Sequence, residues 1–338
     1  MTNLTILLAT YNGEKYLNEQ LDSIFSQTYS NYVLVARDDG SADNTRDILF
    51  GYQRRYTQKL IIVPSHTHTG APKRNFGELI HYLLRVQADL FKGIAYIAFS
   101  DQDDIWQPNK LEVMLENLQQ AEQMYPMAPL IVHSDLELID ASGQLIHKSL
   151  SEYQGFNPKR NFFAQIAIRN VVTGCAMMLN RRALEIGYPI PEEAIEFDWW
   201  LSLSTAAFGK IIFLKERTTQ YRQHIHNFIG ARRSHGFCLS IFKIGLTLLS
   251  RITTALHRVM SRFFWTNGQS HKRDRTELEI IMSLVTRQNQ YFLSRYKENL
   301  KLWQRKVLKK ASGLESRGSA VRRFRIYWLM NIQPMFRK

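Results

Sequence analysis

Residues 96–106 read Tyr-Ile-Ala-Phe-Ser-Asp-Gln-Asp-Asp-Ile-Trp, an apolar run that ends abruptly at three carboxylates. The apolar run begins at Ile94 and is typical of a strand buried on both faces of a parallel sheet. The acids would then stand at the carboxyl end of that strand, which is the edge at which open α/β sheets bind ligands. The stretch therefore predicts a ligand site at a sheet edge.

The three acids are Asp101, Asp103 and Asp104, and they repel one another unless a cation neutralises them. An Asp-x-Asp pattern of hard oxygen ligands suits Mg²⁺ or Mn²⁺ carrying substrate phosphates. This favours a nucleotide-diphosphate site. The alternative is an acidic cap on a helix that begins near Pro108, because Asp at a helix start and Pro at the first helical position are both common.

The 338 residues, 45% of them hydrophobic, are enough for one large globular domain, alone or with an appendage. The two cysteines, Cys175 and Cys238, rule out a disulfide framework and have no zinc-type spacing, which favours a reducing compartment. The first residues have no basic region or cleavage site of a signal peptide. These features predict a cytoplasmic protein.

The net charge of +14 is distributed unevenly along the chain. Residues 1–230 hold 21 Lys and Arg against 25 Asp and Glu, whereas residues 231–338 hold 23 against 5, a balance of +18. Such an asymmetry indicates that the last third meets an anionic partner, either a membrane leaflet or nucleic acid.

The first 230 residues alternate between strand and helix patterns. Strands are predicted at 4–9, 32–36, 60–63 and 94–99, and helices up to about residue 27 and over 76–90. The order predicts an α/β fold with a mostly parallel, doubly wound sheet.

Six short motifs follow one another in this region. They are Thr-Tyr-Asn-Gly at 10–13, Asp-Asp-Gly-Ser-x-Asp-x-Thr at 38–45, Ser-Asp-Gln-Asp-Asp-Ile-Trp at 100–106, Asn-Val-Val-Thr-Gly-Cys at 170–175, Asp-Trp-Trp at 198–200 and Tyr-Arg-Gln-His at 221–224. Together they resemble glycosyltransferase family 2, in particular its bacterial rhamnosyltransferase-like branch. The resemblance covers residues 3–231 and implies an inverting enzyme with the glycosyltransferase-A fold. We expect a catalytic domain at 1–231 and a basic helical region at 232–338.

The resemblance implies a nucleotide site at the ends of the first two strands. Thr10, Tyr11 and Asn12 would contact the base, mainly through their backbone. Asp38 or Asp39 would accept the imide N–H of uracil or thymine, which favours UDP or dTDP donors. The alternative for the two aspartates is a local turn with an Asx cap.

The resemblance also implies a metal site. Asp103 would be the direct ligand of Mg²⁺ or Mn²⁺, and Asp101 would hold the ribose or a metal-bound water. His224 would contact the metal or the diphosphate, although Ile225 replaces the glycine that usually follows it. His68 stands where related sequences often carry Asn. Further donor contacts are expected at three residues, Lys73, Arg74 and Asn75.

Inversion requires one general base opposite the departing nucleotide. Asp198 at a helix start is the candidate and Glu196 the second choice, with a plain helix cap as the alternative. Gly174 would place backbone beside a sugar. Cys175 is interpreted as a small core residue. Trp199 or Trp200 would stack on the acceptor sugar, and the alternative places both in the core.

The tail is expected to act at a membrane surface. Residues 237–256 are apolar but interrupted by Lys243 and Arg251, which predicts an interfacial helix and not a membrane span. Basic clusters with aromatics follow at 258–265, 301–310 and 322–328, and these suit an anionic inner leaflet. The alternative is a helical hairpin packed on the catalytic domain or a dimer interface.

These observations predict a peripheral enzyme on the inner face of the cytoplasmic membrane that makes bacterial surface polysaccharide such as O-antigen, lipopolysaccharide or capsule. It would move rhamnose from dTDP-rhamnose, or another hexose from a UDP donor, to a glycan or lipid-linked oligosaccharide acceptor. Two alternatives are a sugar nucleotidyltransferase of similar fold and a non-catalytic protein that binds nucleic acid or membrane. No nucleic-acid motif is found, so no nucleic-acid partner is expected.

Overall fold

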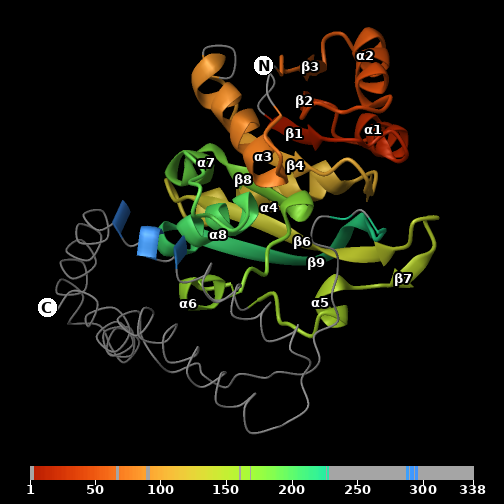
Figure 1. Cartoon of the computed structure of the whole chain (residues 1–338). Helices are drawn as coiled ribbons and strands as arrows, with labels where there is room; N and C mark the ends of the chain where they lie inside the picture. Colours follow the sequence, from red (N-terminus) through yellow and green to blue (C-terminus); the bar gives the residue numbers. More distant parts are fainter. Residues whose placement is uncertain are drawn as a thin grey trace, which may run out of the picture. The chain divides into compact units, whose positions relative to one another are not determined.

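A computed structural model describes residues 4–65, 68–88, 92–159, 161–167, 169–225 and 227, with short pieces at 287–288, 290–292 and 294–295 (Figure 1). The chain divides into two units, Met1–Phe237 and Cys238–Lys338, and the fold below is that of the first. The interfacial helix and the basic clusters expected beyond residue 231 lie outside the described residues. The domain boundary near residue 231 stays a prediction.

The first four strands form the parallel half of the sheet, in the order β3-β2-β1-β4. They are β1 (Leu4–Thr10), β2 (Tyr32–Asp38), β3 (Leu60–Ile62) and β4 (Tyr96–Ser100). Thr10 is the register partner of Asp38, and Leu8 that of Ser100. The doubly wound arrangement predicted from the sequence is confirmed, and the carboxyl ends of β1, β2 and β4 lie at one edge.

The other half of the sheet is mixed. It continues β4-β8-β6-β9-β5, with β7 paired to β6. The strands are β5 (Ile105–Trp106), β6 (Leu130–Ile139), β7 (Leu145–His147), β8 (Met177–Asn180) and β9 (Lys210–Arg222). The β4–β8 and β8–β6 pairs are antiparallel, whereas the long β6–β9 pair is parallel. β5 follows the acidic loop directly and pairs with β9, so the end of β9 is drawn to the same edge.

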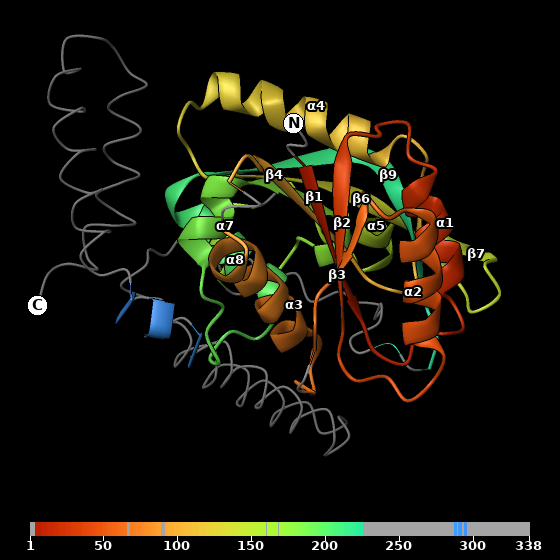
Figure 2. The same ribbon diagram turned by 90° about the horizontal axis from the view of Figure 1, so that it is seen from above.

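Helices cover both faces of the sheet. They are α1 (Leu17–Phe25), α2 (Thr45–Arg55), α3 (Pro72–His81) with a π-helical continuation η1 (Tyr82–Val86), α4 (Lys110–Met124), α5 (Leu150–Tyr153), α6 (Phe163–Ile166), the 3₁₀ turn η2 (Gly174–Ala176), α7 (Arg181–Gly187) and α8 (Phe197–Phe208). Figure 2 shows α1 and α2 on one side of β1–β3 and α3 and α8 on the other. None of the helices within the described residues has the length and apolar character that a membrane crossing requires.

One face of the core carries an aromatic cluster that fixes the start of α8. The ring of Phe197 packs on Phe76 of α3 at 4.1 Å and on Phe99 of β4 at 5.0 Å between centroids. Aromatic pairs of this kind add to the free energy gained by burying their area. Because Phe197 directly precedes Asp198, core packing holds the candidate base near the end of β4.

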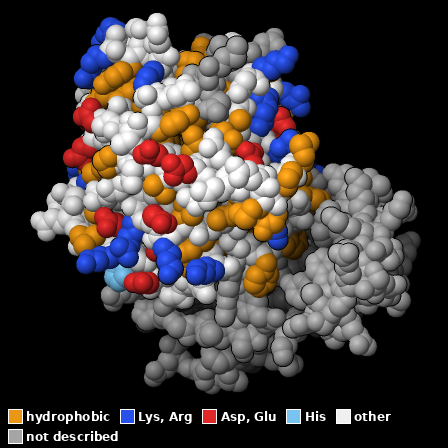
Figure 3. Space-filling model, turned by 180° about the vertical axis from the view of Figure 1, so that it is seen from behind, with side chains coloured by type: hydrophobic (Ala, Val, Ile, Leu, Met, Phe, Trp, Pro, Cys, Tyr) orange, Lys and Arg blue, Asp and Glu red, His pale blue; other side chains and the backbone are white. Residues whose placement is uncertain are grey.

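Charges of both signs occur on the face shown in Figure 3. This agrees with the near balance of acids and bases in residues 1–230. Within the described residues, the basic excess of the chain is therefore not a property of the sheet domain.

Candidate active site

The acidic loop 101–104 follows β4 and does not cap the next helix. The N-cap position of α4 is Asn109, five residues beyond the last acid, and no side chain bonds there. The alternative of a simple acidic helix cap is therefore wrong.

The two aspartates at the end of β2 already have hydrogen-bond partners within the protein. The carboxylate of Asp38 accepts bonds from Thr10 Oγ1 at 3.1 Å, Ser41 Oγ at 2.5 Å and the Ser41 N–H at 2.9 Å. The carboxylate of Asp39 accepts bonds from Arg37 Nη1 at 2.7 Å and from the Thr69 N–H at 2.8 Å. The local-turn alternative thus describes Asp38 but not Asp39, whose partner Thr69 is 30 positions away. Recognition of the nucleotide base by either aspartate stays a prediction.

Burial alone would raise the pKa of Asp39. Hydrogen bonds from Arg37, Thr69 and the Gly70 N–H nevertheless hold that pKa below its usual range. Asp39 therefore links β2 to the loop at Thr69 through hydrogen bonds that favour its ionised form.

The loop after β1 presents the Tyr11 ring. The Tyr11 side chain is 47% exposed, and its ring lies 5.0 Å from that of His68. The backbone N–H and C=O of Tyr11 both bond to the Gln102 side chain. Asn12 has a left-handed φ of 47°, and its N–H and Oδ1 bond to Ser41 and Ala42. Contact of this segment with a nucleotide base stays a prediction.

The expected donor contacts after His68 already have partners within the protein. Lys73 Nζ donates to the carbonyls of Glu192 at 2.8 Å and Ala194 at 2.7 Å, and Arg74 pairs with Glu192. Asn75 is buried and bonds to Arg37 and to the Thr10 carbonyl. A donor contact by Asn75 is wrong because its amide is enclosed in the protein.

Two of the predicted metal residues, Asp103 and His224, lie together. His224 Nε2 is 2.8 Å from Asp103 Oδ2. The Tyr16 ring stacks on the His224 ring at 5.0 Å. Arg222 bonds to the acidic loop through two groups. Its side-chain Nε donates to the Asp103 carbonyl at 2.9 Å, and its backbone N–H donates to Asp104 Oδ1 at 3.1 Å.

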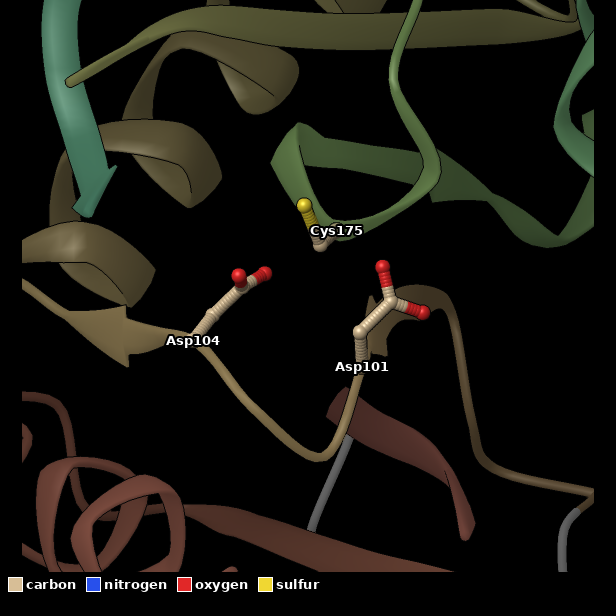
Figure 4. A group of neighbouring side chains, drawn as sticks. All are labelled: Asp101, Asp104 and Cys175. Carbon is tan, nitrogen blue, oxygen red and sulfur yellow. The ribbon is translucent and has the colours of Figure 1, made fainter. Parts of the chain in front are cut away.

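A second group of ligand atoms lies beside this pair. One ligand atom each of Asp101, Asp104 and Cys175 lies within 4.8 Å of the others, and Figure 4 shows the three side chains converging. Burial, followed by repulsion from Asp103 and Asp198, raises the pKa of Asp101 to about 7. Burial and repulsion from Asp103 raise that of Asp104 well above its usual range.

The residues present fit a divalent cation. Asp104 Oδ2 is buried and has no hydrogen-bond partner among the described residues, and a cation would relieve the repulsion that raises the pKa of the neighbouring carboxyls. Carboxylate oxygens suit Mg²⁺ or Mn²⁺. The interpretation of Cys175 as buried is confirmed, but its sulfur also faces the acids, which the sequence did not predict.

Lys110, on α4, is a buried cation that the sequence did not predict. Its Nζ donates to the Cys175 carbonyl at 2.5 Å and to Thr219 Oγ1 at 2.6 Å, and it lies 4.0 Å from the centre of the Trp106 ring. Burial lowers the pKa of Lys110 to about 8. A lysine in a helical pattern predicts a solvated side chain, so no sequence signal marked it.

Asp198 lies in the first turn of α8, next to the turn that carries Cys175. Asp198 Oδ2 accepts a bond from the Gly174 N–H at 2.9 Å. A side chain at Gly174 would place its Cβ 2.7 Å from Phe197 Cζ, so glycine is needed for this approach. The N-cap of α8 is Glu196, whose side chain makes no cap bond; the plain-cap alternative for Asp198 is therefore wrong.

The pKa values of the two acids before α8 are both raised. Burial raises the pKa of Asp198 to about 6, against the opposing effect of the Trp199 and Gly174 N–H groups. Burial and repulsion from Asp198 raise the pKa of Glu196 to about 8. At neutral pH, Asp198 is thus the ionised member of the pair and the one suited to accept a proton.

The two tryptophans differ in position. Trp200 is fully buried, and its Nε1 donates to the Gly187 carbonyl at 2.7 Å. Stacking of Trp200 on a sugar is therefore wrong, and the core alternative holds for it. Trp199 is half-buried and donates to the Ile166 carbonyl at 2.5 Å, so a contact with the acceptor stays a prediction for Trp199 alone.

Comparison with known proteins identifies a family match. The model of the family described as Glycosyl transferase family 2 matches residues 5–186. An uncharacterized glycosyltransferase of Nostoc sp. is 25% identical over 233 residues, 65% of each chain. The dTDP-rhamnosyl transferase RfbG of Shigella flexneri is 39% identical over 111 residues, 33% of this chain and 36% of that protein. The chain thus matches less than two thirds of the length of either relative.

A third relative has a fuller match along its own length. TuaG of Bacillus subtilis, whose name refers to teichuronic acid biosynthesis, is 25% identical over 215 residues, 62% of this chain and 76% of that protein.

Proposed function

The chain belongs to glycosyl transferase family 2, and on this basis we propose that it is an inverting, metal-dependent glycosyltransferase. It would move a sugar from a dTDP- or UDP-sugar to a hydroxyl of a glycan or lipid-linked acceptor. The family match favours this function over a sugar nucleotidyltransferase or a non-catalytic binding protein.

One observation carries the proposal: consecutive residues of η2 connect the candidate base to the acids. The Gly174 N–H holds Asp198, and the next residue, Cys175, faces Asp101 and Asp104. An inverting transfer needs one base on one side of the anomeric carbon and a stabilised diphosphate on the other. This turn supports both groups from one short segment.

In the proposed mechanism, the oxygen of the acceptor hydroxyl attacks the anomeric carbon, and Asp198 accepts the proton of that hydroxyl. The Gly174 N–H orients the carboxylate. The pKa of Asp198 is about 6, so its carboxylate is ionised at neutral pH. This pKa is also close enough to neutral pH for the carboxylate to act as a base. The acceptor oxygen forms its bond to the anomeric carbon as the bond to the nucleotide diphosphate breaks. This direct displacement inverts the configuration at that carbon.

We assign the cation to the acidic loop. Asp103 and His224 would hold Mg²⁺ or Mn²⁺, with Asp101 beside them. When bound, such a cation neutralises the charge that develops on the departing diphosphate. Arg222 fixes the backbone of this loop from β9, so the ligands are held in place before the donor arrives.

For the donor we propose dTDP-rhamnose first and UDP-hexoses second. The support is the name and partial match of the dTDP-rhamnosyl transferase RfbG. For the product we propose bacterial surface polysaccharide, which the name of TuaG supports. The exposed Tyr11 ring would meet the base.

The proposed place of action is the inner surface of the cytoplasmic membrane. The balance of +18 in residues 231–338 would bind anionic lipid. Cosedimentation of the full chain with vesicles containing phosphatidylglycerol, but not with pure phosphatidylcholine vesicles or DNA, is the expected result. Equal binding to DNA would contradict it.

Transfer assays with purified full chain test the function. The chain is incubated with dTDP- and UDP-sugars and Mn²⁺, with and without EDTA, and released nucleotide is measured. We expect one donor to be turned over only with metal, and NMR of the product to show the inverted anomer. Retention of configuration, or turnover unaffected by EDTA, would contradict the proposal.

A further inference from the structure

The side chain of Gln102 bonds to both backbone groups of Tyr11. Gln102 Oε1 accepts from the Tyr11 N–H at 2.8 Å, and Gln102 Nε2 donates to the Tyr11 carbonyl at 2.9 Å. The two residues are 91 positions apart. The Tyr11 N–H is a donor and the Tyr11 carbonyl is an acceptor, so the positions of the oxygen and nitrogen in the Gln102 side-chain amide follow from these two bonds.

Gly13 leaves the space that this side chain occupies. A Cβ at Gly13 would lie 2.3 Å from Gln102 Oε1 and 2.6 Å from Gln102 Cδ. Gly13 is not among the described glycines with positive φ, so its backbone conformation is open to alanine. The demand for glycine here therefore comes from the Gln102 side chain.

The same loop is tied on its other side to the loop after β2. The Asn12 N–H donates to Ser41 Oγ at 2.8 Å and the Gly13 N–H to Thr45 Oγ1 at 2.7 Å. Segment 10–13 is thus bonded on one side to the loop after β2 and on the other to the acidic loop, through Gln102.

We propose that Gln102 is a positioning residue that fixes the Tyr11 loop relative to Asp101 and Asp103. This inference rests on the proposed function. A nucleotide diphosphate spans from a base platform to the cation, so both ends must be held at the correct separation before binding. Holding them in advance reduces the ordering cost of binding the donor.

Glutamine has the reach and the paired donor and acceptor that this position uses. Asparagine is shorter by one methylene, and glutamate lacks the donor that meets the Tyr11 carbonyl. The position lies between two metal-loop aspartates but carries no charge of its own, which also avoids further repulsion in this loop.

A double-mutant cycle tests the proposal. Gly13→Ala, Gln102→Ala and the double variant are compared with the full wild-type chain, with Gln120→Ala, an exposed glutamine on α4, as the control. We expect Gly13→Ala alone to weaken UDP or dTDP binding roughly tenfold, and to have little further effect once Gln102 is alanine, because contacting residues couple. Equal effects of Gly13→Ala in both backgrounds would overturn the proposal.

Two further measurements separate positioning from simple support of the fold. Gln102→Ala should raise the donor KM roughly tenfold with kcat nearly kept, and it should speed hydrogen exchange of the Tyr11 amide, whereas Gln120→Ala changes neither. Unchanged exchange and KM would overturn the proposal. If the wild type binds no nucleotide, the proposed function fails, while hydrogen exchange of the Tyr11 amide in Gln102→Ala still decides whether Gln102 holds Tyr11.

Discussion

His224 Nε2 lies 2.8 Å from Asp103 Oδ2 although 121 positions separate the two residues. The pair joins the end of β9 to the acidic loop after β4, and the Tyr16 ring covers the imidazole. At this separation, the imidazole nitrogen and the carboxylate oxygen would both be within reach of one divalent cation.

Replacement of His224 by alanine should weaken Mn²⁺ binding. Loss of a residue that merely supports a ligand typically costs about 10–100-fold in metal affinity, so loss of a ligand should cost at least about tenfold. Free Mn²⁺ measured by EPR in the absence of donor gives the affinity. Unchanged Mn²⁺ affinity in His224→Ala would exclude this residue as a ligand.

Asp198→Asn should abolish most of the transfer while donor binding persists. The amide can still accept the Gly174 N–H but cannot take a proton, and general bases contribute about 10²–10⁴-fold to rate. We expect kcat to fall within this range and the nucleotide Kd to stay unchanged. The matched control is Glu116→Gln, an exposed carboxylate on α4. A comparable loss in the control, or full activity of Asp198→Asn, would remove Asp198 from the role of base.

The transfer rate should fall as the solution becomes acidic. Burial raises the pKa of Asp198 to about 6, and the base works only when ionised. Therefore kcat/KM should be constant well above pH 6 and fall tenfold per pH unit well below it. A pH profile of kcat/KM at saturating Mn²⁺ measures this limb. A flat profile between pH 4.5 and 8 would contradict it.

Local patterns predicted the parallel half of the fold but not the mixed half. The apolar runs of β1, β2 and β4 are recognisable without knowledge of their partners. By contrast, β6 carries His133, Ser134 and Asp135 at its centre, all buried. Two of the three have distant partners: Ser134 Oγ lies 2.7 Å from Thr218 Oγ1, and Asp135 Oδ2 accepts a bond from Ser149 Oγ at 2.6 Å. A polar stretch of this kind indicates a strand only once its partner on β9 is known.

The candidate site divides in the same way. Asp101, Asp103 and Asp198 were predicted because acids at strand and helix ends are visible in the sequence. Gln102 and Lys110 were not, since the first acts on backbone 91 positions away and the second is buried by strands that the sequence did not reveal.

The two tryptophans of α8 should respond differently to truncation. Trp200→Ala should lower the free energy of unfolding by about 3–5 kcal/mol, because it empties a fully buried site. Trp199→Phe should leave the fold intact and raise the acceptor KM with little change in donor KM. Urea unfolding and steady-state kinetics distinguish the two outcomes. Loss of stability in Trp199→Phe as large as in Trp200→Ala would contradict the difference in burial.

The stability of the chain should depend on pH through Glu196. Its pKa is raised from 4.5 to about 8 by burial and by repulsion from Asp198. Below about pH 4.5 both the folded and the unfolded chain hold the proton, so the residue carries no penalty. As the pH rises towards 8, only the unfolded chain ionises freely, and the folded state loses relative stability.

Glu196→Gln removes this titration and gives the test. The variant should unfold at a higher temperature than the wild type at pH 8, and the difference should shrink at pH 5, when both are measured with EDTA. A divalent cation near Asp198 would offset the repulsion, so added Mn²⁺ should also reduce the difference at pH 8. A gap in Tm that is the same at both pH values would mean that Glu196 does not titrate in this range in the folded protein.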